Sequence, residues 1–193
     1  MTLSGQTASP ERARVFFALW PEAALAERLA ALAEAQAAAV GGRAMARETL
    51  HLTLAFLGDV PLETLPALQE AGHLVARQQV MHHVFPLEFS LDHFGYWQHN
   101  HLAWIGCRTP VAALHGLAGA LAAAVGELGF ALESRPFVPH VTLVRRAPVA
   151  PPCREEALPL SWRATDFALL RSRRHAGGAA YETLARWPVE GSA

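Results

Sequence analysis

Two tetrapeptides of one pattern, His51-Leu-Thr-Leu54 and His140-Val-Thr-Leu143, lie nearly half a chain apart in this 193-residue sequence. Both stand in apolar, β-branched stretches that are typical of strands. Because successive side chains of a strand point to opposite faces, each stretch buries its apolar residues and presents a histidine beside a threonine. The repeat therefore predicts two similar lobes, related by a rough two-fold axis, which face each other across a cleft.

The segments around the tetrapeptides predict an α+β fold. Helices are expected to begin at Pro21, Leu62 and Pro110, where apolar residues follow at helical spacing. Residues 1–10 are small and polar and are expected to form a flexible N-terminal tail, followed by a single bilobed domain over residues 11–190. Strands are predicted over 14–20, 50–57, 85–96, 101–107, 137–145, 165–171 and 181–187. The resulting order, β-α-β-α-β-β-α-β-β-β, differs from strict βαβ alternation.

Composition excludes several classes of protein. Hydrophobic residues make up 52% of the chain and charged residues 17%, which is unlike a disordered protein. A net charge of −1 argues against broad electrostatic capture of long nucleic acid, but it leaves room for recognition of one phosphate-bearing end. No apolar run has the length of a membrane span, and the start lacks the features of a signal peptide, so we expect a cytoplasmic protein. Monomer is the default expectation.

Cysteine and histidine spacing gives no sign of a metal site. Cys107 and Cys153 are too few for a disulfide framework and lack the spacing of metal ligands. The remaining histidines do not fall into a group with convergent carboxylates or thiols. We therefore expect no metal and no other cofactor.

Paired imidazoles suit in-line displacement at phosphorus. One ring can take a proton from the attacking oxygen while the other gives a proton to the leaving oxygen, because an ordinary histidine pKa near 6.5 allows both protonation states. Threonine hydroxyls can donate to the non-bridging oxygens. Arg145 closely follows the second tetrapeptide and is a candidate charge clamp. Strict alternation would place it on the face opposite His140, so a strand end or a local twist must bring it into the cleft.

These residues resemble the two-histidine (2H) phosphoesterase superfamily, and more closely its RNA 2′,3′-cyclic phosphodiesterases, also called 2′-5′ RNA ligase-like proteins. Segments 14–21, 51–58, 137–145 and 181–187 all look like family segments in family order. The resemblance implies the bilobed 2H phosphoesterase fold, with two antiparallel sheets flanked by helices and a central cleft. It also implies metal-independent hydrolysis of a terminal RNA 2′,3′-cyclic phosphate to a 2′-phosphate, and 2′-5′ ligation as the reverse reaction.

The resemblance implies residue roles that the two nearly identical tetrapeptides do not distinguish by themselves. His51 would be the general acid that protonates O3′, and His140 the general base that activates water. Thr53, Thr142 and Arg145 match phosphate-contacting positions, and Arg43, in the loop before the first tetrapeptide, is a weaker match.

The aromatic and basic residues near these segments leave two questions open. Phe56 and Phe137 flank the tetrapeptides, and either could stack on a base; core packing is favoured for Phe56, and Phe137 stays a candidate. The basic residues Arg171–Arg174 lie on a predicted hairpin, and their contact with RNA is undecided.

Two other functions fit the same residues. One is a phosphodiesterase that acts on a small cyclic nucleotide or an ADP-ribose cyclic phosphate, because the motif specifies chemistry at phosphorus better than it specifies the rest of the substrate. The other is a non-catalytic module that binds RNA ends. Partners are accordingly an RNA 3′ end bearing a 2′,3′-cyclic phosphate or a small nucleotide.

Overall fold

The computed structural model describes residues 11–82, 84, 86–132, 135–151, 159–175 and 178–188, without the side chains of 174, 175, 178 and 188. The expected flexible tail, residues 1–10, lies outside the described residues, as does Cys153.

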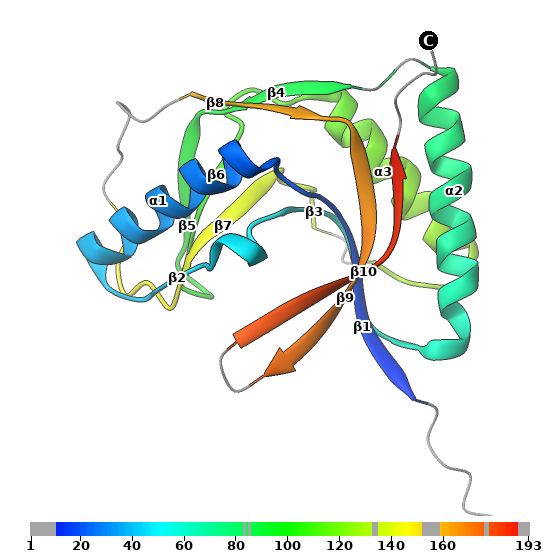
Figure 1. The fold of residues 1–193 in the computed structure, drawn as a ribbon, viewed down its shortest axis with the longest axis horizontal. Helices are drawn as coiled ribbons and strands as arrows, with labels where there is room; N and C mark the ends of the chain where they lie inside the picture. The colour runs from blue at the N-terminus through cyan, green and yellow to red at the C-terminus, as the bar shows by residue number, and fades with distance from the viewer. Residues whose placement is uncertain are drawn as a thin grey trace, which may run out of the picture.

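A large antiparallel sheet forms the centre of the molecule (Figure 1). Its strand order is β10-β9-β1-β3-β7-β6-β5, with the short β2 paired to β7. The pair Leu52–Val141 joins β3 to β7, and each member directly follows one of the two motif histidines. The strands are β1 (Arg12–Leu19), β2 (Arg43–Ala44), β3 (Leu52–Pro61), β5 (His93–Trp97), β6 (Leu102–Gly106), β7 (His140–Arg145), β9 (Asp166–His175) and β10 (Gly178–Pro188).

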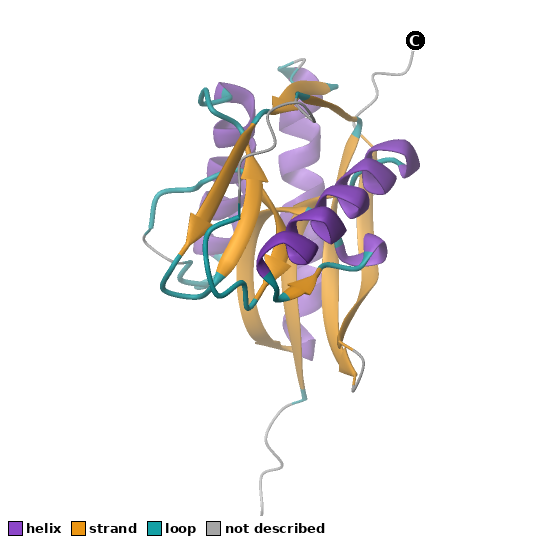
Figure 2. Cartoon of the chain, turned by 90° about the vertical axis from the view of Figure 1, so that its left-hand side faces the viewer, coloured by secondary structure: helices purple, strands orange, loops and turns teal. Residues whose placement is uncertain are grey.

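Helices cover the sheet from two opposite sides (Figure 2). Helix α1 (Ala23–Val40) packs against β7, whereas α2 (Leu65–Met81) and α3 (Ala112–Glu127) lie against each other and contact β10 and β3. Two 3₁₀ turns, η1 (Arg47–Thr49) and η2 (Leu62–Thr64), precede β3 and α2. Within the described residues, no helix is both long enough and apolar enough to cross a bilayer.

Buried leucines, valines and aromatic residues from both halves of the sheet and from all three helices form one core. This burial is the main stabilising term of the fold. Four residues of β1 and β9 form a separate small cluster on the opposite face of the sheet, with Trp20 and Tyr181 packed against it: Phe16, Ala18, Ala168 and Leu170. That second cluster supports the candidate site described below.

Each motif strand carries a β-bulge just after its threonine. In β3 the pairing with β1 skips Leu54, so Leu54 and Ala55 are both buried and Phe56 is exposed. In β7 the pairing with β6 skips Leu143, so Leu143 and Val144 are both buried and Arg145 is exposed. Because an extra residue shifts the alternation by one position, each bulge brings the exposed residue into phase with the histidine and the threonine before it.

The predicted α+β class with antiparallel sheets and flanking helices is confirmed, and the single strand expected over 85–96 is wrong. The chain instead forms β4 (Leu87–Leu91), which pairs with β8 (Leu160–Ala164) in a separate two-stranded sheet, and then β5. Asp92 separates β4 from β5, and its side chain accepts a hydrogen bond from the Arg108 amide at 2.7 Å. Two short strands, β2 and β8, were not predicted from the sequence.

Candidate active site

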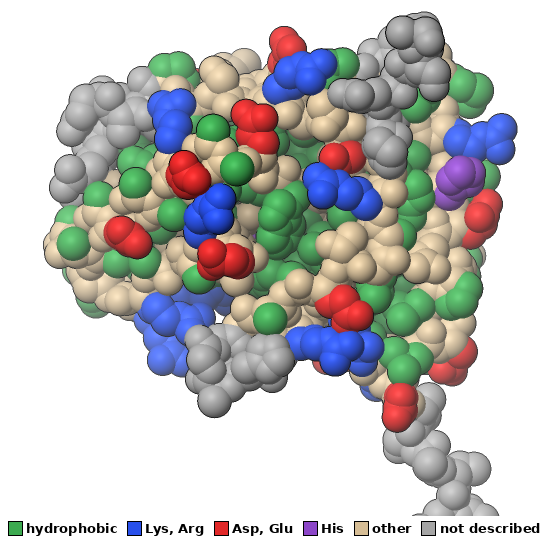
Figure 3. All heavy atoms as spheres, in the orientation of Figure 1, with side chains coloured by type: hydrophobic (Ala, Val, Ile, Leu, Met, Phe, Trp, Pro, Cys, Tyr) green, Lys and Arg blue, Asp and Glu red, His purple; other side chains and the backbone are tan. Residues whose placement is uncertain are grey.

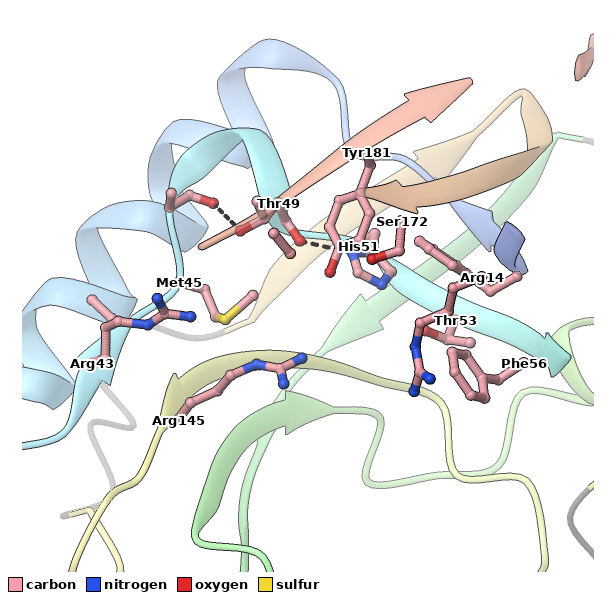
Figure 4. A pocket seen from close by; sticks show the side chains of 14 residues that line it. Arg14, Arg43, Met45, Thr49, His51, Thr53, Phe56, Arg145, Ser172 and Tyr181 are labelled. Atoms are coloured by element: carbon pink, nitrogen blue, oxygen red, sulfur yellow. Dashed lines mark hydrogen bonds between the residues drawn. The ribbon is translucent and has the colours of Figure 1, made fainter. Parts of the chain in front are cut away.

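A pocket of about 340 Å³ lies between β3 and the end of β7 (Figure 4). The strands β1, β2, β3, β9 and β10, together with the segment before β3, provide most of its wall. The lining residues are Arg14, Phe16, Arg43, Ala44, Met45, Ala46, Thr49, His51, Thr53, Phe56, Arg145, Ser172, Ala179 and Tyr181. His51, Thr53, Arg43 and Arg145, all predicted from the sequence, are therefore brought together.

His51 is held in one orientation by a hydrogen bond and by aromatic rings. Its Nδ1 lies 2.7 Å from the Thr49 carbonyl oxygen. A carbonyl can only accept, so Nδ1 donates and Nε2 is left for chemistry. The ring stacks on Trp20 at 5.6 Å between centroids with an interplanar angle of 4°. Phe16 and Tyr181 contact it at centroid distances of 4.9 and 5.1 Å.

His140 is held by the same kind of hydrogen bond on the other side of the junction. Its Nδ1 donates to the Val138 carbonyl at 2.7 Å, so its Nε2 is also left for chemistry. Two tryptophans contact the ring edge-on, Trp97 at 4.5 Å and Trp104 at 6.0 Å between centroids. His140 does not line the pocket, but a positive charge on its ring would oppose protonation of His51.

Both imidazoles are harder to protonate than an ordinary histidine. Burial lowers the pKa of His51 from 6.5 to about 4; the hydrogen bond to Thr49 opposes this, and the charges of His140 and Arg145 add to it. Burial also lowers the pKa of His140, against the effect of its hydrogen bond to Val138. In the ligand-free protein His51 is therefore neutral at pH 7. An anion bound beside the rings would raise the pKa of both.

Arg43 and Arg145 are cross-strand partners, and both line the pocket. Figure 4 shows the two side chains entering the pocket from the same side. Like charges directly opposite each other across two strands destabilise the pair unless a counter-charge lies between them. Guanidinium groups offer paired N–H donors that match the oxygens of a phosphate. This arrangement is consequently suited to an anion.

Besides His140, two predicted site residues lie outside the pocket, and one expected core residue lies inside it. Thr142 and Phe137 are not among the lining residues. Phe137 is half-buried and packs edge-on against His115, with 5.4 Å between ring centroids. Phe56, for which core packing was favoured, is 42% exposed and lines the pocket. That expectation is wrong, because the bulge at Leu54 turns Phe56 to the face of His51.

Three polar residues of the pocket were not predicted from the sequence: Arg14, Ser172 and Tyr181. They form one row across the sheet, since Arg14 pairs with Ser172 and Ser172 with Tyr181. Burial raises the pKa of the Tyr181 hydroxyl, and the nearby Arg145, Arg14 and Arg43 oppose that effect. The sequence offered one signal, because segments 14–21 and 181–187 look like segments of the family. The strand register that aligns the three residues cannot be read from the sequence.

The side chains of the described segments form no group of three or more histidines, cysteines, aspartates and glutamates that could hold a metal ion. Metal-independent chemistry remains a prediction for experiment.

Comparison with known proteins assigns the family. A profile of the 2′-5′ RNA ligase superfamily matches residues 21–176. The chain belongs to that superfamily. It is 33% identical to an RNA 2′,3′-cyclic phosphodiesterase of Escherichia coli over 179 residues, which cover 93% of this chain and 98% of that relative. It is 32% identical to an RNA 2′,3′-cyclic phosphodiesterase of Thermus thermophilus over 189 residues, 92% of this chain and 91% of that relative.

Solved structures of similar proteins share the fold. The structure of E. coli LigT complexed with 3′-AMP superposes with a TM-score of 0.76 at 32% identity, covering 94% of this chain and 100% of that chain. A Thermus thermophilus structure superposes with a TM-score of 0.74 at 28% identity, covering 93% of this chain and 100% of the other. E. coli LigT has also been solved in complex with phosphate and with ATP.

Proposed function

We propose that this protein hydrolyses the 2′,3′-cyclic phosphate at the end of an RNA chain to a 2′-phosphate, using His51 and His140 as a general acid and a general base. The observation that carries the proposal is the matched pair of histidines beside a pocket that contains Arg43 and Arg145. Each Nδ1 is engaged by a backbone carbonyl at 2.7 Å, which leaves each Nε2 for proton transfer. The curated relatives of this chain carry the same activity in their names.

The proton transfers balance in a single displacement. Water attacks phosphorus and gives a proton to Nε2 of His140 while the bond between phosphorus and O3′ breaks. O3′ takes a proton from Nε2 of protonated His51, which yields a 3′-hydroxyl and a 2′-phosphomonoester. The family resemblance supports this division of roles.

The low pKa of free His51 means that the acid must gain its proton with the substrate. The cyclic phosphate is an anion, and an opposite charge within a few ångström favours the protonated imidazole. Arg43, Arg145 and the hydroxyl of Thr53 would bind the non-bridging oxygens and the charge that develops on them. Thr142, next to His140 in β7, would contribute from the other lobe.

The same site would join a cyclic phosphate to a 5′-hydroxyl in a 2′-5′ linkage. The 5′-hydroxyl takes the place of water, so His140 removes its proton while His51 protonates the departing O3′. Water is the abundant nucleophile in an open pocket, so hydrolysis is expected to dominate. Cytoplasmic location and a monomeric state accompany this proposal as predictions.

The experiment is turnover of a short RNA ending in a 2′,3′-cyclic phosphate, in the presence of EDTA, with the product identified by phosphorus NMR. The expected product is the 2′-phosphate, with turnover lowered at least about a hundredfold in both His51→Ala and His140→Ala. Circular dichroism shows whether each variant is folded.

Other outcomes would point to the alternatives. A 3′-phosphate product would contradict the expulsion of O3′, and inhibition by EDTA would contradict metal independence. Turnover of ADP-ribose cyclic phosphate without turnover of RNA would favour a small-molecule phosphodiesterase. Tight binding of the RNA end with no turnover would favour a binding module.

A further inference from the structure

A second hollow opens directly beside the pocket, between β1 and β9. These strands pair from Ala18 and Ala168 as far as Arg14 and Ser172, and their pairing ends there. Beyond that point β1 stays paired with β3, and β9 stays paired with β10. Figure 1 shows the lower end of β1 and the β9–β10 hairpin pointing apart. The groove between them has a volume of about 490 Å³.

Arginines dominate this groove, which we call the basic groove. Its lining residues are Arg12, Ala13, Arg14, Asp59, Arg171, Ser172 and Arg173. Arg14 and Ser172 also line the pocket, so the two hollows share a wall and lie side by side. Figure 3 shows a group of positively charged side chains (blue) between the β9–β10 hairpin and the lower end of β1.

The positive charge of the groove is only partly neutralised. Arg12 donates a hydrogen bond to the main-chain carbonyl oxygen of Asp59. That oxygen is uncharged, so the contact does not neutralise the guanidinium. The ion pair between Arg14 and Asp59 is long, at 3.6 Å, and both partners are exposed, so it contributes little. Arg173 is held closely by Glu182 at 2.6 Å. Of the ion pairs formed among the described residues, none involves Arg171.

We infer that the basic groove binds the phosphodiester backbone of the nucleotides that precede the terminal cyclic phosphate. This inference rests on the proposed function, because it assumes that the cyclic phosphate lies beside His51. Arg14 and Ser172 would then stand at the exit from the pocket, and Arg171 and Arg12 would meet the next phosphates. Each phosphodiester adds one negative charge. Arginine is well suited to bind it, because its planar fork matches two phosphate oxygens.

The consequence is a preference for oligonucleotides. Although the whole chain has a net charge of −1, the local charge of the groove would select a substrate with charged linkages behind its cyclic end. A mononucleotide cyclic phosphate would fill the pocket alone and gain nothing from the groove.

The test compares kcat/KM for cytidine 2′,3′-cyclic phosphate with kcat/KM for a trinucleotide that ends in the same group and carries 2′-O-methyl groups on its first two nucleotides. We expect the wild type to prefer the trinucleotide. Arg171→Gln should lower kcat/KM for the trinucleotide about two- to fivefold, the range of an exposed ion pair, and leave the mononucleotide unchanged. For the trinucleotide, log kcat/KM decreases as log salt concentration rises. This dependence should become shallower by about 0.7 for each phosphate contact that is lost.

Two controls make the assignment specific. Arg163→Gln removes an exposed arginine of β8 that lies outside both hollows. It should leave kcat/KM unchanged for both substrates. Replacing both linkages of the trinucleotide by neutral methylphosphonates should remove the wild-type preference and leave Arg171→Gln with the same kcat/KM as the wild type. Equal effects of Arg171→Gln and Arg163→Gln, or an equal loss on both substrates, would overturn the inference.

The two proposals fail differently. If the wild type hydrolyses neither substrate, the proposed function is wrong. If it hydrolyses both equally fast and His51→Ala stops both reactions, the proposed function stands and the basic groove is not an RNA-binding site.

Discussion

Phe56 and Arg145 occupy equivalent positions in the two lobes. Each follows its histidine and threonine at the same spacing, and each reaches the pocket because its strand carries a bulge at the leucine after the threonine. The bulges convert a repeated sequence pattern into an asymmetric site, since one lobe supplies an aromatic ring and the other a guanidinium group. The phosphate and the base of a nucleotide are therefore expected to lie toward different lobes.

Phe56→Ala should weaken substrate binding more than Phe137→Ala. The Phe56 ring is exposed in the pocket, so a base could stack on it in place of the Arg14 guanidinium, which lies over the ring 4.7 Å from its centroid. Loss of a base–aromatic stack costs about 1–3 kcal/mol, which corresponds to a rise in KM of about 5- to 160-fold. Steady-state kinetics on the trinucleotide checks this. A larger rise in KM for Phe137→Ala, with both variants folded, would assign the stacking to Phe137 instead.

Gly95→Ala should lower kcat by displacing His140 indirectly. Gly95 pairs with Trp104 across β5 and β6, and a methyl group at Gly95 would overlap the Trp104 indole. Because Trp104 packs against His140, the ring of the general base would lose its orientation. Gly116→Ala, in α3 with open space around it, is the matched control and should leave kcat unchanged.

The readout for Gly95→Ala has two parts. A positioning effect lowers kcat with little change in KM and shifts the pH profile of kcat. A variant that loses only stability, with an unchanged pH profile in its folded fraction, would speak against the role of Gly95 in positioning His140.

The pH dependence of kcat/KM should peak below pH 6.5. That parameter reports the free enzyme, in which one histidine must be neutral and the other protonated. Burial lowers both pKa values, that of His51 to about 4, so the protonated form is lost at lower pH than for ordinary histidines. The bound anion raises them, and the maximum of kcat should lie at higher pH than that of kcat/KM. Coincident maxima above pH 7 would contradict this account.

Acid should destabilise the wild type more steeply than His51→Asn. In the unfolded chain His51 takes up its proton near pH 6.5, but in the folded protein only near pH 4. The unfolded state thus binds more protons between these values, and the free energy of unfolding falls as pH falls through that window. One proton contributes at most about 1.4 kcal/mol per pH unit. Urea unfolding at several pH values measures the difference, and parallel curves would contradict the lowered pKa.

The sequence predicted the parts of the site that depend on local periodicity. His51 and Thr53 were predicted on one face of a strand, and the structure places both in the pocket wall. Alternation failed at Phe56 and Arg145, because a bulge depends on the pairing of two strands and leaves no mark in either strand alone. Arg14, Ser172 and Tyr181 come together through the register of β1, β9 and β10, which local patterns do not determine.

The most direct test of the two-histidine mechanism replaces O3′ of the cyclic phosphate by sulfur. A thiolate is a much weaker base than an alkoxide and leaves without a proton, so it bypasses the general acid. We predict that the deficit of His51→Ala shrinks from at least about a hundredfold on the oxygen substrate to less than about tenfold on the sulfur substrate, while that of His140→Ala persists. Rescue of His140→Ala instead would reverse the two roles, and rescue of neither variant would contradict paired acid–base catalysis by His51 and His140.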